Sequence, residues 1–210
     1  MNEVITVLQL IGVASFAVSG AMTAIRKQFD VFGVMILAIV TALGGGLIRD
    51  IIINIVPPFC FAQPMYLYVS AITGLLFFLP FVRRPLMKKR ALFDQVMFWT
   101  DTVGLGLFAV SGVQTAQGVD ASFHPALLLF VGMLTGTGGG ILRDMMVCEV
   151  PGIFIKHVYA LAALGGSAVY LALDALGLPN LAATLIGAAF TIALRFFAAK
   201  YRWNMPRAKE

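Results

Sequence analysis

Long apolar stretches separated by short polar connections run along the whole chain. Seven of them reach or approach the length needed to cross a bilayer, which is about 20 apolar residues. They cover residues 4–25, 31–56, 65–82, 96–116, 125–148, 158–173 and 181–199, and the sixth is the shortest. The pattern predicts an all-α membrane protein with seven transmembrane helices.

The composition agrees with a bilayer as the surrounding medium. Hydrophobic residues make up 60% of the 210 and charged residues 12%. A soluble domain has about 45–50% apolar and about 25% charged residues. No basic segment precedes the first apolar stretch and no small-residue cleavage site follows it, so we expect no removable signal peptide.

The basic residues are distributed unequally between the two predicted sides of the membrane. Seven crossings place all but one of the 15 Lys and Arg residues on one side, with Arg49 alone on the other. The positive-inside rule makes the basic side cytoplasmic, with the amino terminus outside and the carboxyl terminus inside. The net charge of +5 therefore reflects topology and not nucleic-acid binding, and the pattern fits a bacterial inner (plasma) membrane.

The chain contains an internal repeat. Phe-Ala-Val-Ser-Gly at 16–20 recurs at 108–112, an offset of 92, and Gly-Gly-Gly-x-x-Arg-Asp at 44–50 recurs at 138–144, an offset of 94. Each repeat holds three predicted helices, an odd number, so the second repeat is inverted relative to the first. Inverted repeats are a common plan of transport proteins, with the binding site near the midplane.

These features predict one transmembrane domain over residues 1–210. Its parts are repeat one at about 4–82, a basic cytoplasmic loop at 83–95, repeat two at about 96–173, the seventh helix at about 181–199 and a cytoplasmic tail at 200–210. The basic run 83–90 is interpreted as a solvated loop, and specific binding of membrane lipids is the less favoured alternative.

The two glycine triplets are the main candidate site. Three glycines destabilise a helix and a charge pair is costly in lipid. One triplet alone would favour close helix packing. Two copies, each followed by Arg-Asp, favour helices two and five broken at Gly44, Gly45 and Gly46 and at Gly138, Gly139 and Gly140. The carbonyl groups freed by such breaks would suit a cation.

The charges beside the glycines are predicted to be supporting groups: Arg49, Asp50, Arg143 and Asp144. Arg143 and Asp101 lie at the same predicted depth near the cytoplasmic ends of their helices, so we expect an ion pair between them. The equivalent of Asp101 in repeat one is Gln9, near the predicted depth of Arg49, which predicts a hydrogen-bonded arginine on the outer side. A direct Arg49–Asp144 pair is disfavoured because the inverted helices carry the two residues apart.

Several hydroxyl groups at apolar depth are further candidates for a polar path: Ser15, Ser19, Thr41, Ser111, Thr135 and Thr137. The alternative is that each bonds back to its own helix. The two cysteines lie on opposite sides, as do the two histidines, so neither a disulfide nor a metal site is expected. No nucleophile-and-base arrangement is visible, and we expect neither enzyme activity nor a cofactor.

Taken together, the duplicated Gly-Gly-Gly-x-x-Arg-Asp followed by proline, the two Phe-Ala-Val-Ser-Gly segments, Asp101-x-x-Gly104-Leu105 and Tyr159-Ala160 resemble the bacterial TRIC family. These are trimeric intracellular cation channels, whose prokaryotic branch is also labelled as glycine transporters. The resemblance covers residues 5–198 and implies two inverted three-helix repeats plus a seventh helix. It also implies a homotrimer with one pore per subunit for monovalent cations, chiefly potassium, lined by the bent second and fifth helices.

Two transport functions remain open from the sequence. A cation channel for potassium or sodium is favoured because hydroxyl groups occur at several depths. The alternative is an alternating-access transporter of a small zwitterion such as glycine. A purely structural membrane protein is disfavoured by the cost of two charged motifs in lipid.

Overall fold

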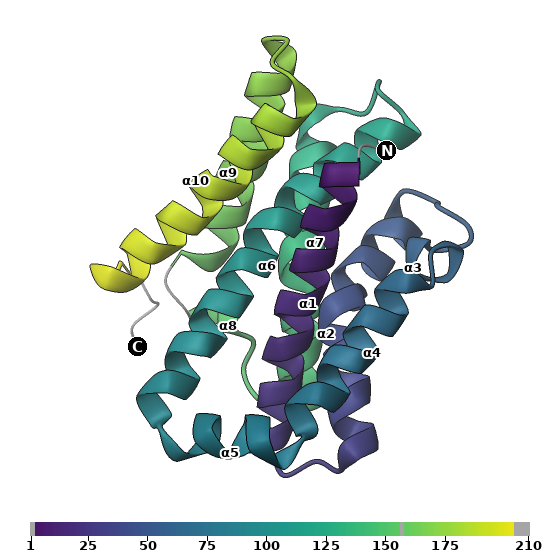
Figure 1. Cartoon of the computed structure of the whole chain (residues 1–210). Coiled ribbons are helices and arrows are strands. Elements are labelled where there is room, and N and C mark those ends of the chain that lie inside the picture. Colours follow the sequence, from purple (N-terminus) through teal and green to yellow (C-terminus); the bar gives the residue numbers. More distant parts are fainter. Residues whose placement is uncertain (1–2, 156–157, 204–210) are drawn as a thin grey trace, which may run out of the picture.

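The computed structural model describes residues 3–155 and 158–203, and within these ranges it is a bundle of α-helices (Figure 1). The ten helices of the described ranges are α1 (Glu3–Arg26), α2 (Val31–Ile52), α3 (Phe59–Ala62), α4 (Met65–Phe78), α5 (Pro80–Lys88), α6 (Arg90–Val119), α7 (Pro125–Met146), α8 (Gly152–Ile155), α9 (Tyr159–Ala175) and α10 (Asn180–Lys200). The predicted all-α membrane fold is confirmed. The part of the predicted tail from residue 204 onward lies outside the described residues.

Each of the seven predicted spans corresponds to a helix, but the helices differ in length. Five of the described helices are long and apolar enough to cross a membrane alone: α1, α2, α6, α7 and α10. Helix α4 reaches that length only together with α5, from which it is bent by 67°. Helix α9 has 17 residues, or roughly 25 Å at the α-helical rise. The count of seven crossings therefore stays a prediction.

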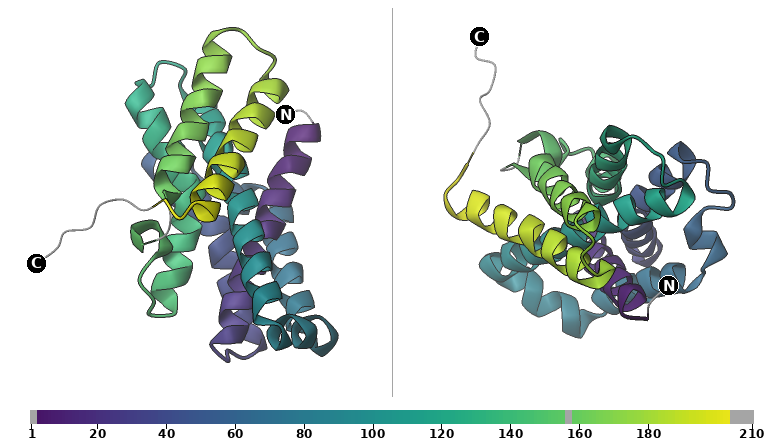
Figure 2. Two further views of the ribbon diagram at one scale, coloured as in Figure 1. Left: turned by 90° about the vertical axis from the view of Figure 1, so that its left-hand side faces the viewer. Right: turned by 90° about the horizontal axis from the view of Figure 1, so that it is seen from above.

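The two repeats are packed against each other in opposite directions. Helix α1 starts beside the amino terminus at the top of Figure 1 and runs down, whereas α6 starts at the bottom and runs up. The main helix contacts join α2 to α7, α6 to α7 and α1 to α2. Helix α10 packs on α9 and α6, outside both three-helix units, and Figure 2 shows α9 and α10 together on one side of the bundle.

The predicted break of the second and fifth helices at the glycines is wrong. Helices α2 and α7 are each continuous α-helices through the triplets. Their glycines serve close packing: a Cβ atom on Gly45 would collide with the carbonyl oxygen of Thr135, and one on Gly139 with the carbonyl oxygen of Thr41. Backbones this close exclude any side chain, so the triplets lie where the two helices cross. The carbonyl groups remain available to the hydrogen bonds of an unbroken helix.

The prediction that residues 83–95 form a loop is also wrong, because nearly all of this segment is helical. Residues 83–88 belong to α5, and α6 begins at Arg90, six residues before the predicted span. In Figure 1, α5 runs across the bottom of the bundle. We call this end, which carries the carboxyl end of α1, the helix α5 and the start of α6, the basic end, and the opposite end the far end.

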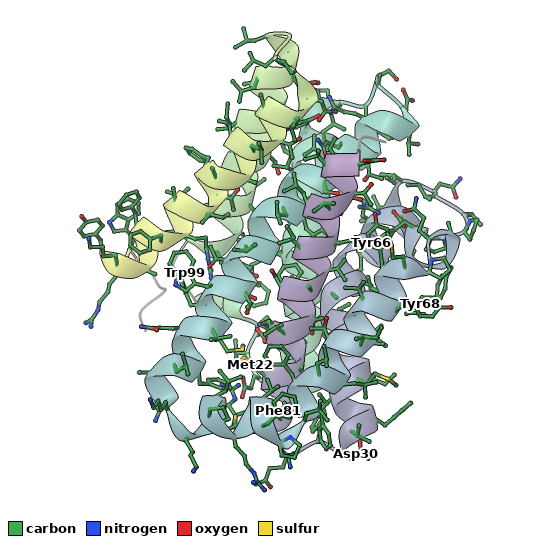
Figure 3. All side chains as sticks on the ribbon, in the orientation of Figure 1. Met22, Asp30, Tyr66, Tyr68, Phe81 and Trp99 are labelled. Carbon is green, nitrogen blue, oxygen red and sulfur yellow. The ribbon has the colours of Figure 1, made fainter. Side chains whose placement is uncertain are left out.

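Large aromatic side chains are exposed on the surface of the bundle. Phe81 lies near the basic end, whereas Tyr68 and Trp99 lie farther up the bundle (Figure 3). Trp99 stacks on Phe196 of α10, and Tyr201 stacks on Trp203.

Candidate functional site

Buried charges gather on the basic-end side of the α2–α7 crossing. Nη1 of Arg143 lies 3.0 Å from Oδ1 of Asp101 and also donates to the hydroxyl group of Ser19. The Arg143 guanidinium donates through Nε to Asp144, 2.9 Å away. The Arg143–Asp101 ion pair predicted from depth is confirmed, and it joins repeat two to Ser19 of repeat one.

A second arginine reaches the same carboxylate, and the sequence analysis did not single it out. Nη2 of Arg195 in α10 lies 3.4 Å from Oδ2 of Asp101 and 3.4 Å from the hydroxyl group of Thr102. The Arg195 guanidinium also stacks over the ring of Tyr159, 4.3 Å from the ring centre. An arginine within the apolar sequence of α10 was the available signal, because such a charge needs a buried partner.

The far-end cluster contains one charge pair and several neutral groups. Arg49 donates through Nε to Oδ1 of Asp50 at 2.8 Å, and its guanidinium lies over the ring of Phe59. Gln9 donates to the hydroxyl group of Ser111 and accepts from the hydroxyl group of Tyr66 at 2.6 Å. The predicted charge pair is confirmed at the basic end, where Arg143 pairs with Asp101. At the far end Arg49 is hydrogen-bonded as predicted, but it also forms an ion pair, with Asp50, so both halves hold a charge pair.

Asp50 and Asp144, the aspartates of the two motifs, make equivalent hydrogen bonds in the two repeats. The second carboxylate oxygen of Asp50 accepts from the backbone N–H of Phe59 at 2.7 Å. That of Asp144 accepts from the backbone N–H of Gly152 at 2.8 Å. Each Arg-Asp pair thus fixes the chain that follows its helix, because the carboxylate satisfies a backbone donor of the next short helix.

Two separate polar cavities lie on either side of the crossing. The far-end cavity, of about 150 Å³, is lined by Gln9, Ala42, Gly46, Arg49, Phe59, Gln63, Tyr66, Phe108, Ser111, Thr115 and Thr135. The basic-end cavity, of about 220 Å³, is lined by Arg26, Phe93, Asp94, Met97, Phe98, Asp101, Arg143 and Arg195. The two cavities share no lining residue, so protein atoms separate one from the other.

A pair of aromatic rings on α1 and α6 lies between the far-end cavity and the Arg143–Asp101 pair. On α1, Phe16 comes between Gln9 and Ser19. Its ring stacks on that of Phe108, with ring centres 5.4 Å apart. Both rings are nearly fully buried. They form an apolar layer between the far-end cavity and the Arg143–Asp101 pair.

The predicted hydroxyl groups divide into two kinds. Those of Thr41, Thr135 and Thr137 donate back to carbonyl groups of their own helices, as the alternative interpretation had it. Those of Ser19 and Ser111 instead accept from groups on other helices. Thr135 and Ser111 nevertheless face the far-end cavity.

The other predicted residues lie around the crossing. Gly46 lines the far-end cavity, and Gly140 and Thr137 line a small pocket of about 10 Å³ beside Asp101 and Asp144. Gly44 faces Leu142, and Gly138 faces the backbone of Gly45. Among the described residues, no group of three His, Cys, Asp or Glu side chains has the arrangement of a metal site.

A family described as "Glycine transporter" matches the chain over residues 6–81 and 98–175. These two stretches coincide with the two internal repeats. The UPF0126 membrane protein of Deinococcus radiodurans is 40% identical over 162 residues, 76% of this chain and 72% of that protein. The UPF0126 inner membrane protein YadS of Escherichia coli is 34% identical over 200 residues, 95% of this chain and 93% of that protein.

Solved structures of cation channels share the fold. The TRIC trimeric intracellular cation channel orthologue from Rhodobacter sphaeroides has 34% identity and a TM-score of 0.87, covering 96% of this chain and 100% of that one. A prokaryotic TRIC channel studied in 0.5 M KCl has 27% identity and a TM-score of 0.86, covering 98% of this chain and 100% of that one.

Proposed function

Because this chain belongs to the bacterial TRIC family, we propose that it forms a channel for monovalent cations, chiefly potassium, with one pore in each subunit of a homotrimer. The observation that carries the proposal is the pair of polar cavities at opposite ends of one subunit. Helices α1, α6 and α7 contribute lining residues to both cavities. A pore within one subunit needs polar spaces of this kind on both sides of its narrowest point.

The proposed path starts in the far-end cavity and ends in the basic-end cavity. Ser111 and Thr135 would supply oxygen atoms to an entering cation, as hydroxyl groups replace part of its hydration shell. The cation would leave past Asp101 and Arg143. The glycines of α2 and α7 act here through their small size, which lets both helices lie against this path.

Two features would close the pore in the arrangement described. The stacked Phe16–Phe108 pair is an apolar constriction, and an apolar constriction stops ions by excluding water. The Arg143–Asp101 pair ties up the carboxylate that a cation would need. Opening would therefore require the two rings to separate and Arg143 to leave Asp101.

Planar-bilayer recording tests this function directly. Purified protein is reconstituted between chambers of unequal KCl concentration, with empty membranes as the control. We expect discrete current steps and a reversal potential that is shifted from zero toward the potassium equilibrium value. A reversal potential at the chloride equilibrium value, or membranes without current, would contradict it.

A second function has one specific observation in its favour. The far-end cavity of about 150 Å³ is large enough for a small zwitterion and contains Arg49, a group suited to a carboxylate. The matching family is described as a glycine transporter. The same reconstituted protein should be tested for uptake of labelled glycine into liposomes: saturable uptake without current would favour the transporter over the channel.

A further inference from the structure

Helix α10 places a buried positive charge against the site without belonging to either repeat. Arg195 is 5% exposed and lies in the last third of α10. The repeat offset pairs each of α1–α4 with one of α6–α9, so the far-end cluster has no equivalent of Arg195. The seventh helix therefore adds one charge to the basic-end cavity alone.

The Arg195 guanidinium is held less tightly to Asp101 than that of Arg143. The nearest nitrogen–oxygen distances are 3.4 Å for Arg195 and 3.0 Å for Arg143. Within the residues that the structure describes, Nε of Arg195 has no hydrogen-bond partner. The aromatic rings of Tyr159 and Phe98 hold its plane in position, at 4.3 Å and 5.4 Å from the ring centres.

The consequence is electrostatic. The basic-end cavity is lined by three arginines and two aspartates: Arg26, Arg143, Arg195, Asp94 and Asp101. Arg143 also pairs with Asp144, and Arg26 pairs with Glu149, so the buried group of Arg143, Arg195, Asp101 and Asp144 carries no net charge. Arg195 supplies one of its two positive charges, and without it one carboxylate would be left uncompensated at a place that a cation would have to pass. Charges at the wall of a low-dielectric cavity act strongly on a passing ion.

We propose that Arg195 is a selectivity-determining residue of the pore, which holds the second oxygen of Asp101 and sets the electrostatic barrier that cations meet in the basic-end cavity. The proposal rests on the proposed channel function. It assigns the seventh helix a role in conduction beyond packing, because that helix carries the charge that limits cation entry from one end only.

The test compares Arg195→Gln, Arg195→Lys and the wild type in bilayers with a KCl gradient. Loss of one charge from the cavity wall should raise the potassium conductance roughly two- to fivefold. It should also move the reversal potential toward the potassium equilibrium value. Arg195→Lys keeps the charge, so its reversal potential should stay near that of the wild type. Arg202→Gln is the matched control, because Arg202 is exposed just beyond the end of α10.

Each outcome decides a different question. Absence of wild-type current would contradict the channel itself. Wild-type current with an unchanged Arg195→Gln variant would contradict only the role of Arg195. Equal losses in the Gln and Lys variants would show that the residue acts through its packing, which also overturns the proposal. If Arg195→Gln does not yield folded protein, Arg195→Met, which keeps a similar volume without charge, takes its place.

Discussion

At the scale of single residues, the buried charges are balanced in small groups. Arg49 pairs with Asp50, while Asp101 accepts from both Arg143 and Arg195. Removing one partner of a buried pair leaves the other charge uncompensated, which costs about 3–5 kcal/mol. We therefore expect Asp101→Asn to lower the melting temperature in detergent strongly.

A double-mutant cycle separates this electrostatic effect from lost packing. Asp101→Asn combined with Arg195→Gln removes one charge of each sign, so the double variant should be more stable than the sum of the single effects. Asp94→Asn is the control, because Asp94 lines the same cavity but is exposed. Additive effects of the two substitutions would show that Asp101 and Arg195 are not coupled.

An exposed ion pair at the basic end makes a pH prediction. Glu149 lies 2.9 Å from both Arg26 and Lys27, and its hydrogen bonds to these residues hold the pKa of its carboxyl group below the ordinary value of 4.5. A carboxyl group with a lowered pKa stabilises the fold above its unfolded-state pKa, and this contribution is lost as the pH falls through the folded-state pKa. Because the groups are partly exposed, the contribution is about 0.2–1 kcal/mol.

Melting curves of the wild type and of Glu149→Gln, measured between neutral pH and pH 3, check this prediction. The wild type should be slightly more stable near neutral pH, and the two curves should converge as the pH falls below 4.5. A constant difference at every pH would mean that the pair acts through packing or hydrogen bonding and not through charge.

At the scale of helices, the glycine triplets make the crossing of α2 and α7 possible. A Cβ atom at position 139 would collide with the backbone of α2. Gly139→Ala should therefore force the helices apart and destabilise the protein by about 1–3 kcal/mol, as overpacking does. Gly118→Ala is the matched control, since a Cβ atom there meets nothing within 4 Å.

The two alanine variants also separate packing from bending. If the glycines only destabilised the helix, both substitutions would stabilise the protein by about 0.5–1 kcal/mol. A Gly139→Ala variant as stable as Gly118→Ala would thus contradict the close packing seen between α2 and α7. The measurement is the melting temperature of each variant in the same detergent.

The same helices show what the sequence determines and what it does not. The length of the apolar stretches located the spans, and the predicted depth of each residue located the Arg143–Asp101 pair. Both need only the position of a residue along its own helix. The continuity of α2 through Gly44–Gly46 could not be read in this way, since it depends on the backbone of α7 filling the space. The contact of Arg195 with Asp101 was missed for the same reason: it depends on where α10 docks.

At the scale of the whole molecule, the inverted repeats have different ends. The basic end carries α5 with its exposed Lys and Arg side chains, while Arg49 is buried at the far end. By the positive-inside rule, we expect the basic end to face the bacterial cytoplasm. The carboxyl terminus, which follows α10, would then be cytoplasmic and the amino terminus periplasmic.

Reporter fusions at the carboxyl terminus test this orientation. A fused green fluorescent protein should fluoresce, because it folds in the cytoplasm, whereas a fused alkaline phosphatase should be inactive, because it needs periplasmic oxidation. Replacing Arg83, Arg84, Lys88 and Lys89 with glutamine is the informative variant, since short basic segments next to a span dominate orientation. It should weaken the preference and give a mixed population. Active phosphatase on the unmodified chain would place the basic end outside, against the positive-inside rule.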